Sequence, residues 1–578
     1  MKLQILFLAL CLITIKTSAF NNEPIDPKKP INDTHWNDIK KSLYFSFIDA
    51  DFSLSKHHYP KNDQINNTWH AKAWKNEIIQ TQLAFWNNIP KYNGQEVTLL
   101  TSDLKSASAT ISKENITFSP IAYIISDDPF KLKSGCGISI ILDSTLTADR
   151  IQNTSTFIYQ ANETRPLWLS IHIPENIMPG QYNGTLSLRI GANKKTISLP
   201  YSITVSSRTL PSSNDWNFHL DIWQNPYSSA RYYNVEPFSE KHLEIIKPNM
   251  QRLANAGQKN ITASIIYDPW NSQTLDKYDS MIKWTKKKDG SWDYDYTNFD
   301  KWVEYMHNIG ITDYINCYSM IPWNLSFYYF DEETNSNKIL KAKPDEPSYK
   351  EHWLPFLKDF AQHLKNKGWF DKTTIAMDER PMPHMQSAIA IIKNADKDFN
   401  ISLAGYYHEE ISDDIIDYSI PLYTDMSDNI LASRKAKNYK TTLYTCCTEI
   451  LPNTFTSSGF YEPTWLMLNS VERGFDGYLR WSFDNWNSSP LEDTRFGSWP
   501  AGDTYLIYPN NETSIRFENL IDGIQQVEKI RVLREELKDN PEAIKSIEEQ
   551  IKNFSNKDIQ RDLIPSQVKS LKKTLNSL

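Results

Sequence analysis

The sequence has little cysteine for its length, with 5 cysteines in 578 residues. Cys11 lies in an N-terminal apolar run, and the others are Cys136, Cys317, Cys446 and Cys447. These four are too few and too far apart for a disulfide scaffold or for a zinc site with paired cysteines. Because cysteine is among the most buried residue types, we predict buried thiols, with a redox role for the neighbouring Cys446 and Cys447 as the alternative.

Basic segments are also lacking. The chain has 62 Lys and Arg against 70 Asp and Glu, a net charge of −8, and no block of positive charge. Nucleic acid is therefore not an expected partner, because such binding depends on neutralising phosphates. The motifs of zinc proteases, nucleotide-binding loops, serine esterases and EF-hands are absent as well. No pattern calls for a metal or a cofactor, and we predict neither.

Long hydrophobic runs are absent after the first residues. Lys2, the apolar run from Leu3 to Ile15 and the small residues before Phe20 have the three parts of a secretory signal peptide. We predict a signal peptide at 1–19 and an exported protein, periplasmic or secreted. Leu10 is bulky where a lipoprotein signal needs a small residue, which disfavours lipid anchoring at Cys11. No later stretch approaches the roughly 20 apolar residues of a membrane helix, so no integral membrane segment is expected.

Aromatic residues are abundant, at 13% of the chain. They suit either a packed core or a ligand with flat apolar faces, such as a sugar. At about 100–200 residues per domain, the length predicts two to four packed units.

The segment from Ser42 to Ser206 is a series of short alternating runs separated by turn residues. Pro179-Gly180 and Asn183-Gly184 are clear turn signals. This pattern predicts an antiparallel β-sandwich over residues 20–210. Its expected strands include Leu43–Ile48, Ile138–Leu142, Leu167–Ile173 and Gly184–Ile190.

Beyond Trp216 apolar strands alternate with amphipathic helices. The pattern predicts a TIM-like (β/α)8 barrel over residues 215–530, followed by a helical segment at 531–578 that covers its outside. A doubly wound open sheet is the alternative, but no glycine-rich fingerprint follows any strand. The eight expected strands are Phe218–Trp223, Ile261–Ile266, Thr312–Ser319, Thr373–Met377, Ile401–Tyr406, Ile415–Tyr423, Thr441–Cys446 and Gly477–Phe483.

The fourth of these strands runs directly into Asp378 and Glu379. In a (β/α)8 barrel the working groups lie at the C-terminal ends of the strands. Two adjacent, desolvated acids raise the pKa of at least one of them, which supplies a proton donor near neutral pH. We predict Glu379 as the general acid. The alternative is a surface pair held by Arg380 or by a helix N-terminus.

Adjacent carboxylates also restrict the mechanism. A protein nucleophile in a retaining glycosidase sits about 5–5.5 Å from the acid, usually on another strand. Neighbours in sequence suit a substrate that supplies its own nucleophile, such as the acetamido oxygen of a 2-acetamido sugar. Asp378 would then stabilise the positive charge of the oxazolinium.

Further side chains at the expected strand ends could form the walls of the site. Taken singly, an aromatic residue belongs to a core more often than to a ligand site, and the two interpretations are nearly balanced only for Trp481, Trp486, Tyr406 and Tyr423. The predicted substrate-binding residues are His219, Asp221, Trp223, Tyr318, Tyr406, Tyr423, Tyr444, Trp481, Asp484, Trp486 and Asp503.

Several motifs carry a family resemblance: NFHLDIWQNP on the first strand, AMDERP on the fourth, GYLRWSFDNW on the eighth, then GDTYLIYP and SIRFENLIDGI. With them the sequence resembles glycoside hydrolase family 123, the bacterial N-acetyl-β-galactosaminidases. The earlier segment RPLWLSIHIPENIMPGQYNGTLSLRI resembles the sandwich that precedes the barrel in that family. The resemblance implies that Asp378 orients the acetamido group and that Glu379 is the general acid.

We therefore expect an exo-acting, retaining glycoside hydrolase that releases terminal β-linked N-acetylgalactosamine from glycans such as glycosphingolipid headgroups. The preference for the galacto sugar follows from the resemblance alone. The alternatives are a broader β-N-acetylhexosaminidase and a non-catalytic glycan-binding protein. The sequence leaves the oligomeric state open.

Overall fold

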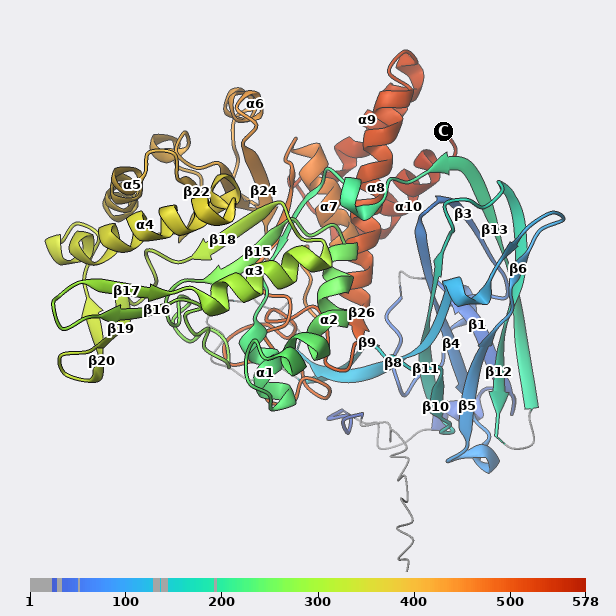
Figure 1. Cartoon of the computed structure of the whole chain (residues 1–578). Helices are drawn as coiled ribbons and strands as arrows, with labels where there is room; N and C mark the ends of the chain where they lie inside the picture. The colour runs from blue at the N-terminus through green and yellow to red at the C-terminus, as the bar shows by residue number, and fades with distance from the viewer. Residues whose placement is uncertain (1–22, 29–33, 50–51, 128–135, 137–143, 192–194) are drawn as a thin grey trace, which may run out of the picture.

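The computed structural model describes residues 23–28, 34–49, 52–127, 136, 144–191 and 195–578. A strand-rich N-terminal part stands beside a barrel, and the C-terminal helices lie between and behind them (Figure 1). The predicted signal peptide at 1–19 and the predicted strand at 138–142 lie outside the described residues.

The N-terminal part is a sandwich of two 7-stranded sheets. Its core lies between them, and residues such as Tyr182, Leu186 and Leu188 alternate inward along one strand. Among the described residues its strand pairs are antiparallel, with the exception of β13 and β3, which run parallel with Tyr201 opposite Trp69. The first sheet contains, in order, β2 (Ile65–Asn66), β1 (Leu43–Ile48), β4 (Ile78–Asn87), β11 (Glu163–His172), β8 (Ile116–Ser126), β9 (Thr145–Ile151) and β26 (Thr513–Ser514). The second contains β10 (Thr156–Ile158), β5 (Glu96–Thr101), β12 (Gly180–Ile190), β13 (Lys195–Thr209) and β3 (Trp69–Lys75), with β6 (Leu104–Lys105) and β7 (Thr110–Ile111) beside β12.

The barrel consists of 8 parallel strands and confirms the predicted fold class. The first strand pairs with the last, while the first and second meet through a single bridge between Leu220 and Gln258. The Gln258 side-chain amide completes this seam, accepting the Ile222 N–H at 2.9 Å and donating to the Ile222 carbonyl at 3.1 Å. The strands are β14 (His219–Ile222), β15 (Asn260–Ser264), β18 (Tyr314–Tyr318), β21 (Thr373–Asp378), β22 (Asn400–Ala404), β23 (Asp417–Pro421), β24 (Lys440–Tyr444) and β25 (Gly477–Arg480).

Amphipathic helices surround the barrel. In α4, for example, Trp353, Phe356, Phe360 and Leu364 are buried on one face, and the helix ends at Gly368 with a φ of 70°. None of the helices in the described part of the chain combines the length and the apolar character that crossing a membrane requires. The helices are α1 (Pro226–Tyr233), α2 (Glu240–Asn255), α3 (Thr297–Ile309), α4 (Pro347–Lys367), α5 (Met382–Ala395), α6 (Asp428–Ala436), α7 (Glu462–Glu472), α8 (Ile515–Glu536), α9 (Pro541–Ile551) and α10 (Ile564–Leu575).

A 4-stranded sheet that the sequence analysis missed is built from the loops after β15 and β18. Its apolar face packs on α4, where the Trp284 ring lies 4.1 Å from that of Phe356. The sheet thus extends one wall of the barrel beyond the strand ends. Its strands are β17 (Trp292–Asp295), β16 (Lys283–Lys286), β19 (Ser326–Asp331) and β20 (Ser336–Lys341).

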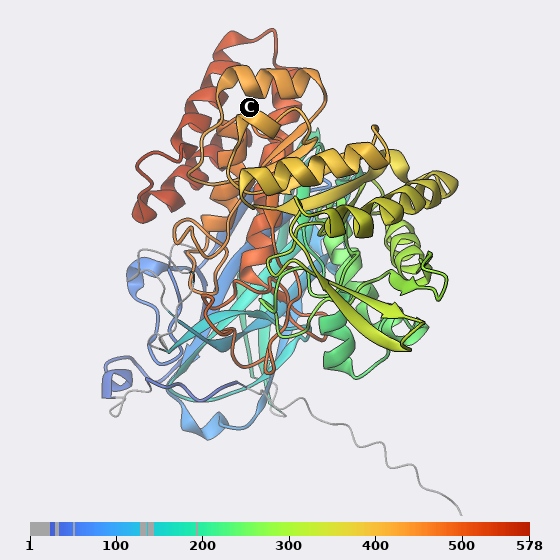
Figure 2. The same cartoon turned by 90° about the vertical axis from the view of Figure 1, so that its left-hand side faces the viewer.

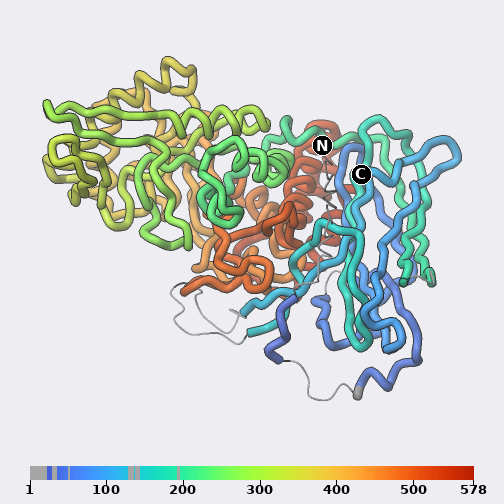
Figure 3. Tube along the Cα trace, turned by 60° about the horizontal axis from the view of Figure 1, so that its bottom comes forward, coloured from blue at the N-terminus to red at the C-terminus, as the bar shows by residue number. Residues whose placement is uncertain are grey.

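The sandwich and the barrel are joined by structure from the end of the chain. Strand β26, which follows the barrel, pairs with β9 of the sandwich through Thr513 opposite Ile151. On α8, Lys529 forms a fully buried ion pair of 2.6 Å with Glu77 of the sandwich. The C-terminal helices, red in Figures 2 and 3, stand against the blue and cyan strands of the sandwich.

Replacing Lys529 by methionine is expected to lower the free energy of unfolding by about 3–5 kcal/mol, because the Glu77 carboxylate stays buried without its cation. Denaturant unfolding of the two proteins measures the difference. The matched control is Lys538→Met, since Lys538 pairs with Glu535 on the exposed surface of the chain. An equal, small effect of both substitutions would contradict the prediction.

Candidate active site

Asp378 and Glu379 lie at the C-terminal end of β21, and α5 begins three residues later at Met382. Asp378 is 7% exposed and pairs with Ala404 of the neighbouring strand. Glu379 is half-buried. Gly405 makes room for it, because a Cβ at that position would lie 2.8 Å from the Glu379 Cβ. The pair is therefore built into the barrel mouth rather than held on the outer surface.

Burial raises the pKa of both carboxyl groups. For Asp378 it raises the pKa to about 6, opposed by the Arg380 cation and the Ser319 hydroxyl. Burial also raises the pKa of Glu379, opposed by the Tyr406 N–H, His408 and Arg380. Both groups therefore hold a proton closer to neutral pH than an exposed carboxyl does, which suits proton transfer.

Arg380 is in contact with both members of the pair. Its Nη1 donates a hydrogen bond to the Glu379 carbonyl. Its Nη2 lies 3.7 Å from Asp378 Oδ2. The guanidinium also lies over the Trp323 ring, with its carbon 3.9 Å from the ring centroid.

A cluster of aromatic rings fills the mouth beside the carboxylates. The Trp223 and Tyr318 rings lie 4.4 Å apart, and Trp270 is 5.2 Å from each of them. Tyr444 and Trp481 pack against the same cluster. The structure thus brings four predicted residues together: Trp223, Tyr318, Tyr444 and Trp481. Trp270 was missed, although it follows the second strand within a few residues, where the strand-end rule could have found it.

Three further aromatic side chains at the strand ends are exposed to solvent. Tyr406 is 53% exposed, Tyr423 is 57% exposed and Trp323 is 55% exposed. The Tyr423 hydroxyl donates to the Leu451 carbonyl at 2.5 Å, which fixes the ring. Solvent-exposed aromatic rings at a barrel mouth can pack against the apolar faces of a sugar.

His219 and Asp221 lie deeper than predicted. His219 Nε2 is 2.9 Å from Asp417 Oδ2, and both side chains are buried. Asp221 accepts a hydrogen bond of 3.0 Å from the Asn316 amide, and burial raises its pKa to about 7. His219 and Asp221 lie four and two positions before Trp223 and point to the same inward side, so they form polar layers inside the barrel below the mouth.

Three predicted residues hold the loops after β25. Asp484 accepts the Asn225 N–H at 2.8 Å, and Trp486 is 1% exposed with its indole N–H donating to the Ile507 carbonyl at 2.8 Å. Asp503 forms a fully buried ion pair of 2.6 Å with Arg480. These contacts fix the loops at the mouth, although Asp503 Oδ2 is buried without a hydrogen-bond partner among the described residues.

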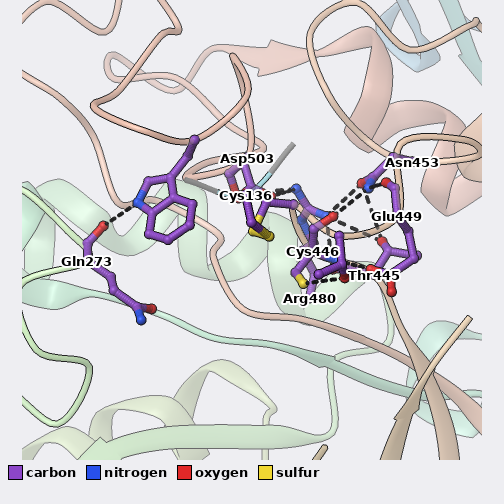
Figure 4. The surroundings of a disulfide bond; sticks show 11 residues. Cys136, Gln273, Thr445, Cys446, Glu449, Asn453, Arg480 and Asp503 are labelled. Carbon is purple, nitrogen blue, oxygen red and sulfur yellow. Dashed lines mark hydrogen bonds and ion pairs between the residues drawn. A yellow bond between two sulfur atoms is a disulfide. The ribbon is translucent and has the colours of Figure 1, made fainter. Parts of the chain in front are cut away.

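The prediction of four buried thiols is wrong for two of them. Cys136 and Cys447 form a disulfide across a separation of 311 residues, which attaches a segment of the sandwich to the end of β24. Figure 4 shows this bond near Arg480, Asp503 and Glu449. Cys317 is a buried thiol as predicted, and Cys446 is a half-buried thiol.

Within the described residues, the group of side chains close enough together to bind a metal ion consists of three of these cysteines. Cys136, Cys446 and Cys447 place their sulfur atoms within 4.8 Å of one another. Because two of them are bonded to each other, they are not free to bind a metal as thiolates.

Replacing Cys447 by serine is expected to lower the free energy of unfolding by about 2–4 kcal/mol, because the disulfide closes a very long loop of the unfolded chain. Thermal unfolding without reductant measures the change. Cys446→Ser is the matched control at the neighbouring position, and equal stability of the two variants would contradict the prediction.

Comparisons with known proteins agree with this geometry. A model of the glycoside hydrolase 123 catalytic domain matches residues 223–533, and one of the family's N-terminal domain matches residues 47–190. A family 123 glycoside hydrolase from Clostridium perfringens, described for glycolipid glycan hydrolysis, is 29% identical with a TM-score of 0.83, covering 93% of this chain and 98% of that chain. A β-glucuronidase from Parabacteroides merdae is 8% identical with a TM-score of 0.29, covering 77% of this chain and 50% of that chain, and supports no conclusion. A search of curated proteins gave no match.

The catalytic-domain match spans more than half of the sequence and includes seven of the eight barrel strands, from β15 onward, with Asp378 and Glu379. The sandwich and the barrel are matched in the same order in which this chain folds them. On these grounds the chain belongs to glycoside hydrolase family 123.

Proposed function

We propose that this glycosidase is an exo-acting, retaining β-N-acetylgalactosaminidase that works by substrate-assisted catalysis. Glu379 protonates the glycosidic oxygen, and Asp378 orients the acetamido group while its carbonyl oxygen attacks C1. The observation that carries the proposal is the pair of consecutive carboxylates at the end of β21, one buried and one half-buried.

The different surroundings of the two acids support different roles. Glu379 is the more accessible, and its raised pKa favours the protonated form that a general acid needs. Asp378 is buried next to a cation that opposes the rise in its pKa and so favours a negative charge, which can stabilise an N–H group that becomes positive. The aromatic cluster beside them, with the partly buried Tyr444 and Trp481 packed against it, suits the apolar face of the sugar ring.

For the natural substrate we propose glycans with terminal β-linked N-acetylgalactosamine, including glycolipid headgroups. The similarity to the Clostridium perfringens protein, described for glycolipid glycan hydrolysis, supports this substrate class. We also propose export from the cytoplasm. The signal-like residues at the N-terminus and the disulfide between Cys136 and Cys447 support it, because such bonds persist in oxidising compartments.

The experiment is release of p-nitrophenol by the purified chain from its N-acetyl-β-D-galactosaminide, with the N-acetylglucosaminide and the β-galactoside as controls. Activity on the first alone is the expected result. Equal activity on both acetamido sugars would instead indicate a broader hexosaminidase. Activity on the β-galactoside would contradict the role of the acetamido group.

Stereochemistry is tested on the same substrate. Proton NMR of the first product is expected to show the β-anomer, because two inversions at C1 restore the configuration. An initial α-anomer would overturn the oxazolinium mechanism.

A further inference from the structure

Arg380 directly follows the two acids, and the chemistry proposed above gives it no task. Its side chain is 7% exposed. Yet Nε and Nη2, which form one edge of the guanidinium, are buried without a hydrogen-bond partner among the described residues. A buried cation with an unused edge is costly, so a structural role alone explains this arrangement poorly.

Two contacts fix the position of the guanidinium. Nη1 donates to the Glu379 carbonyl, which holds the group in its own plane. The Trp323 ring covers one face at 3.9 Å, a stacking geometry that a planar, delocalised cation permits and an ammonium does not. Because Trp323 is 55% exposed, it also separates the cation from bulk water at the mouth.

The remaining edge lies near Asp378. Nη2 is 3.7 Å from Asp378 Oδ2, and this oxygen is also buried without a hydrogen-bond partner among the described residues. Opposite charges at this separation interact strongly where water is excluded. The cation therefore favours both the ionised form of Asp378 and one orientation of its carboxylate.

We propose that Arg380, held between Trp323 and the Glu379 carbonyl, is a positioning residue that keeps Asp378 ionised and oriented toward the acetamido group of the substrate. The inference rests on the role proposed for Asp378 above. It adds a residue that acts on the reaction without touching the reacting atoms.

The proposal has a pH signature with a definite sign. Burial raises the pKa of Asp378 to about 6, and Arg380 opposes this rise. If Asp378 must be ionised, activity falls as the pH drops through its pKa. Removing the cation raises that pKa further, so the acidic limb of the profile moves to higher pH. The groups that act on Asp378 or on its neighbour are Arg380 and Glu379 from the loop, Tyr318 and Ser319 from the end of β18, and Tyr406 and His408 after β22.

The test is the pH dependence of kcat/KM for the full chain and for Arg380→Gln and Arg380→Lys, on the aryl N-acetyl-β-galactosaminide. In Arg380→Gln the acidic limb is expected to move up by about one pH unit. In Arg380→Lys the acidic limb should lie between those of the wild type and Arg380→Gln, because lysine keeps the positive charge but not the planar guanidinium.

Arg208→Gln is the matched control. Arg208 also lies over a tryptophan, at 5.6 Å from the Trp74 ring, and pairs with Glu536, but it belongs to the junction of the sandwich and α8. Its pH profile should equal that of the wild type. The pH profile of Asp378→Asn should lack the acidic limb that arises from protonation of Asp378.

A second measurement covers variants with little activity. A thiazoline that mimics the oxazolinium should bind the wild type with a Kd that rises as the pH falls, and calorimetry should show the same upward shift in Arg380→Gln. An unchanged limb in a folded Arg380→Gln, by rate and by binding, would overturn the inference and leave the proposed function intact. A wild type without activity and without thiazoline binding would overturn both.

Discussion

Glu379→Gln should slow hydrolysis of a natural-type glycan about 10²- to 10⁴-fold and slow an activated aryl glycoside far less. Glutamine keeps the size and the hydrogen-bonding capacity of the side chain but cannot donate a proton to the leaving oxygen. A sugar alkoxide needs that proton, whereas a nitrophenolate leaves without it. The comparison of kcat/KM on the two substrates measures the difference.

The chain contains its own control for this substitution. The dipeptide Asp345-Glu346 repeats the sequence of the site, but it is exposed in the loop before α4. Glu346→Gln should leave both rates unchanged. If Glu379→Gln lowered both rates by the same factor, proton donation by this residue would be refuted.

Asp378→Asn should lower kcat/KM about 10²- to 10³-fold for every leaving group, good or poor. Asparagine can still accept a hydrogen bond from the acetamido N–H, but it has no charge to stabilise the oxazolinium. The acetamido oxygen bonds to C1 in the same displacement that breaks the bond to the leaving group, so every leaving group depends on this charge. A series of aryl glycosides with different leaving groups measures whether the loss is uniform.

The exposed Asp345→Asn serves as the control for this series. A loss confined to poor leaving groups would transfer the general-acid role to Asp378. Full activity of Asp378→Asn would show that the buried carboxylate takes no part in the reaction.

The barrel could be predicted because its local signals agree with its global fold. Each strand is a short apolar run, and each helix buries one stripe, so the periodicity of the sequence changes where the structure does. The strand predicted at Thr373–Met377 is observed at Thr373–Asp378. That accuracy placed the two acids at a strand end without any knowledge of their neighbours.

The depth of a residue within the barrel could not be predicted in the same way. The strand pattern indicates which side chains point inward, but not the level at which the polar layers end and the mouth begins. His219 in β14 and Trp223 directly after it share one inward-facing side, yet only Trp223 reaches the aromatic cluster. The sequence pattern also cannot tell a ligand-binding aromatic residue after a strand from one that stabilises a loop, and the indole of Trp486 does the latter.

Contacts between segments far apart in the chain could not be predicted from the sequence either. The Cys136–Cys447 disulfide joins residues 311 apart, and no local pattern pairs one of four scattered cysteines with another. Strand β26 has 2 residues, too few for any periodicity, and it exists only because β9 lies beside it. These links depend on the fold that they complete.

The position of β26 has a consequence for synthesis of the protein. A chain made from its N-terminus usually completes its first domain before the next one emerges. Here the first sheet receives its last strand from Thr513–Ser514, and the buried Glu77 receives its cation from Lys529, both after the entire barrel. On the ribosome the sandwich therefore has an open sheet edge, and Glu77 lacks its cation, until the residues after the barrel are made, so the domain that is made first is completed last.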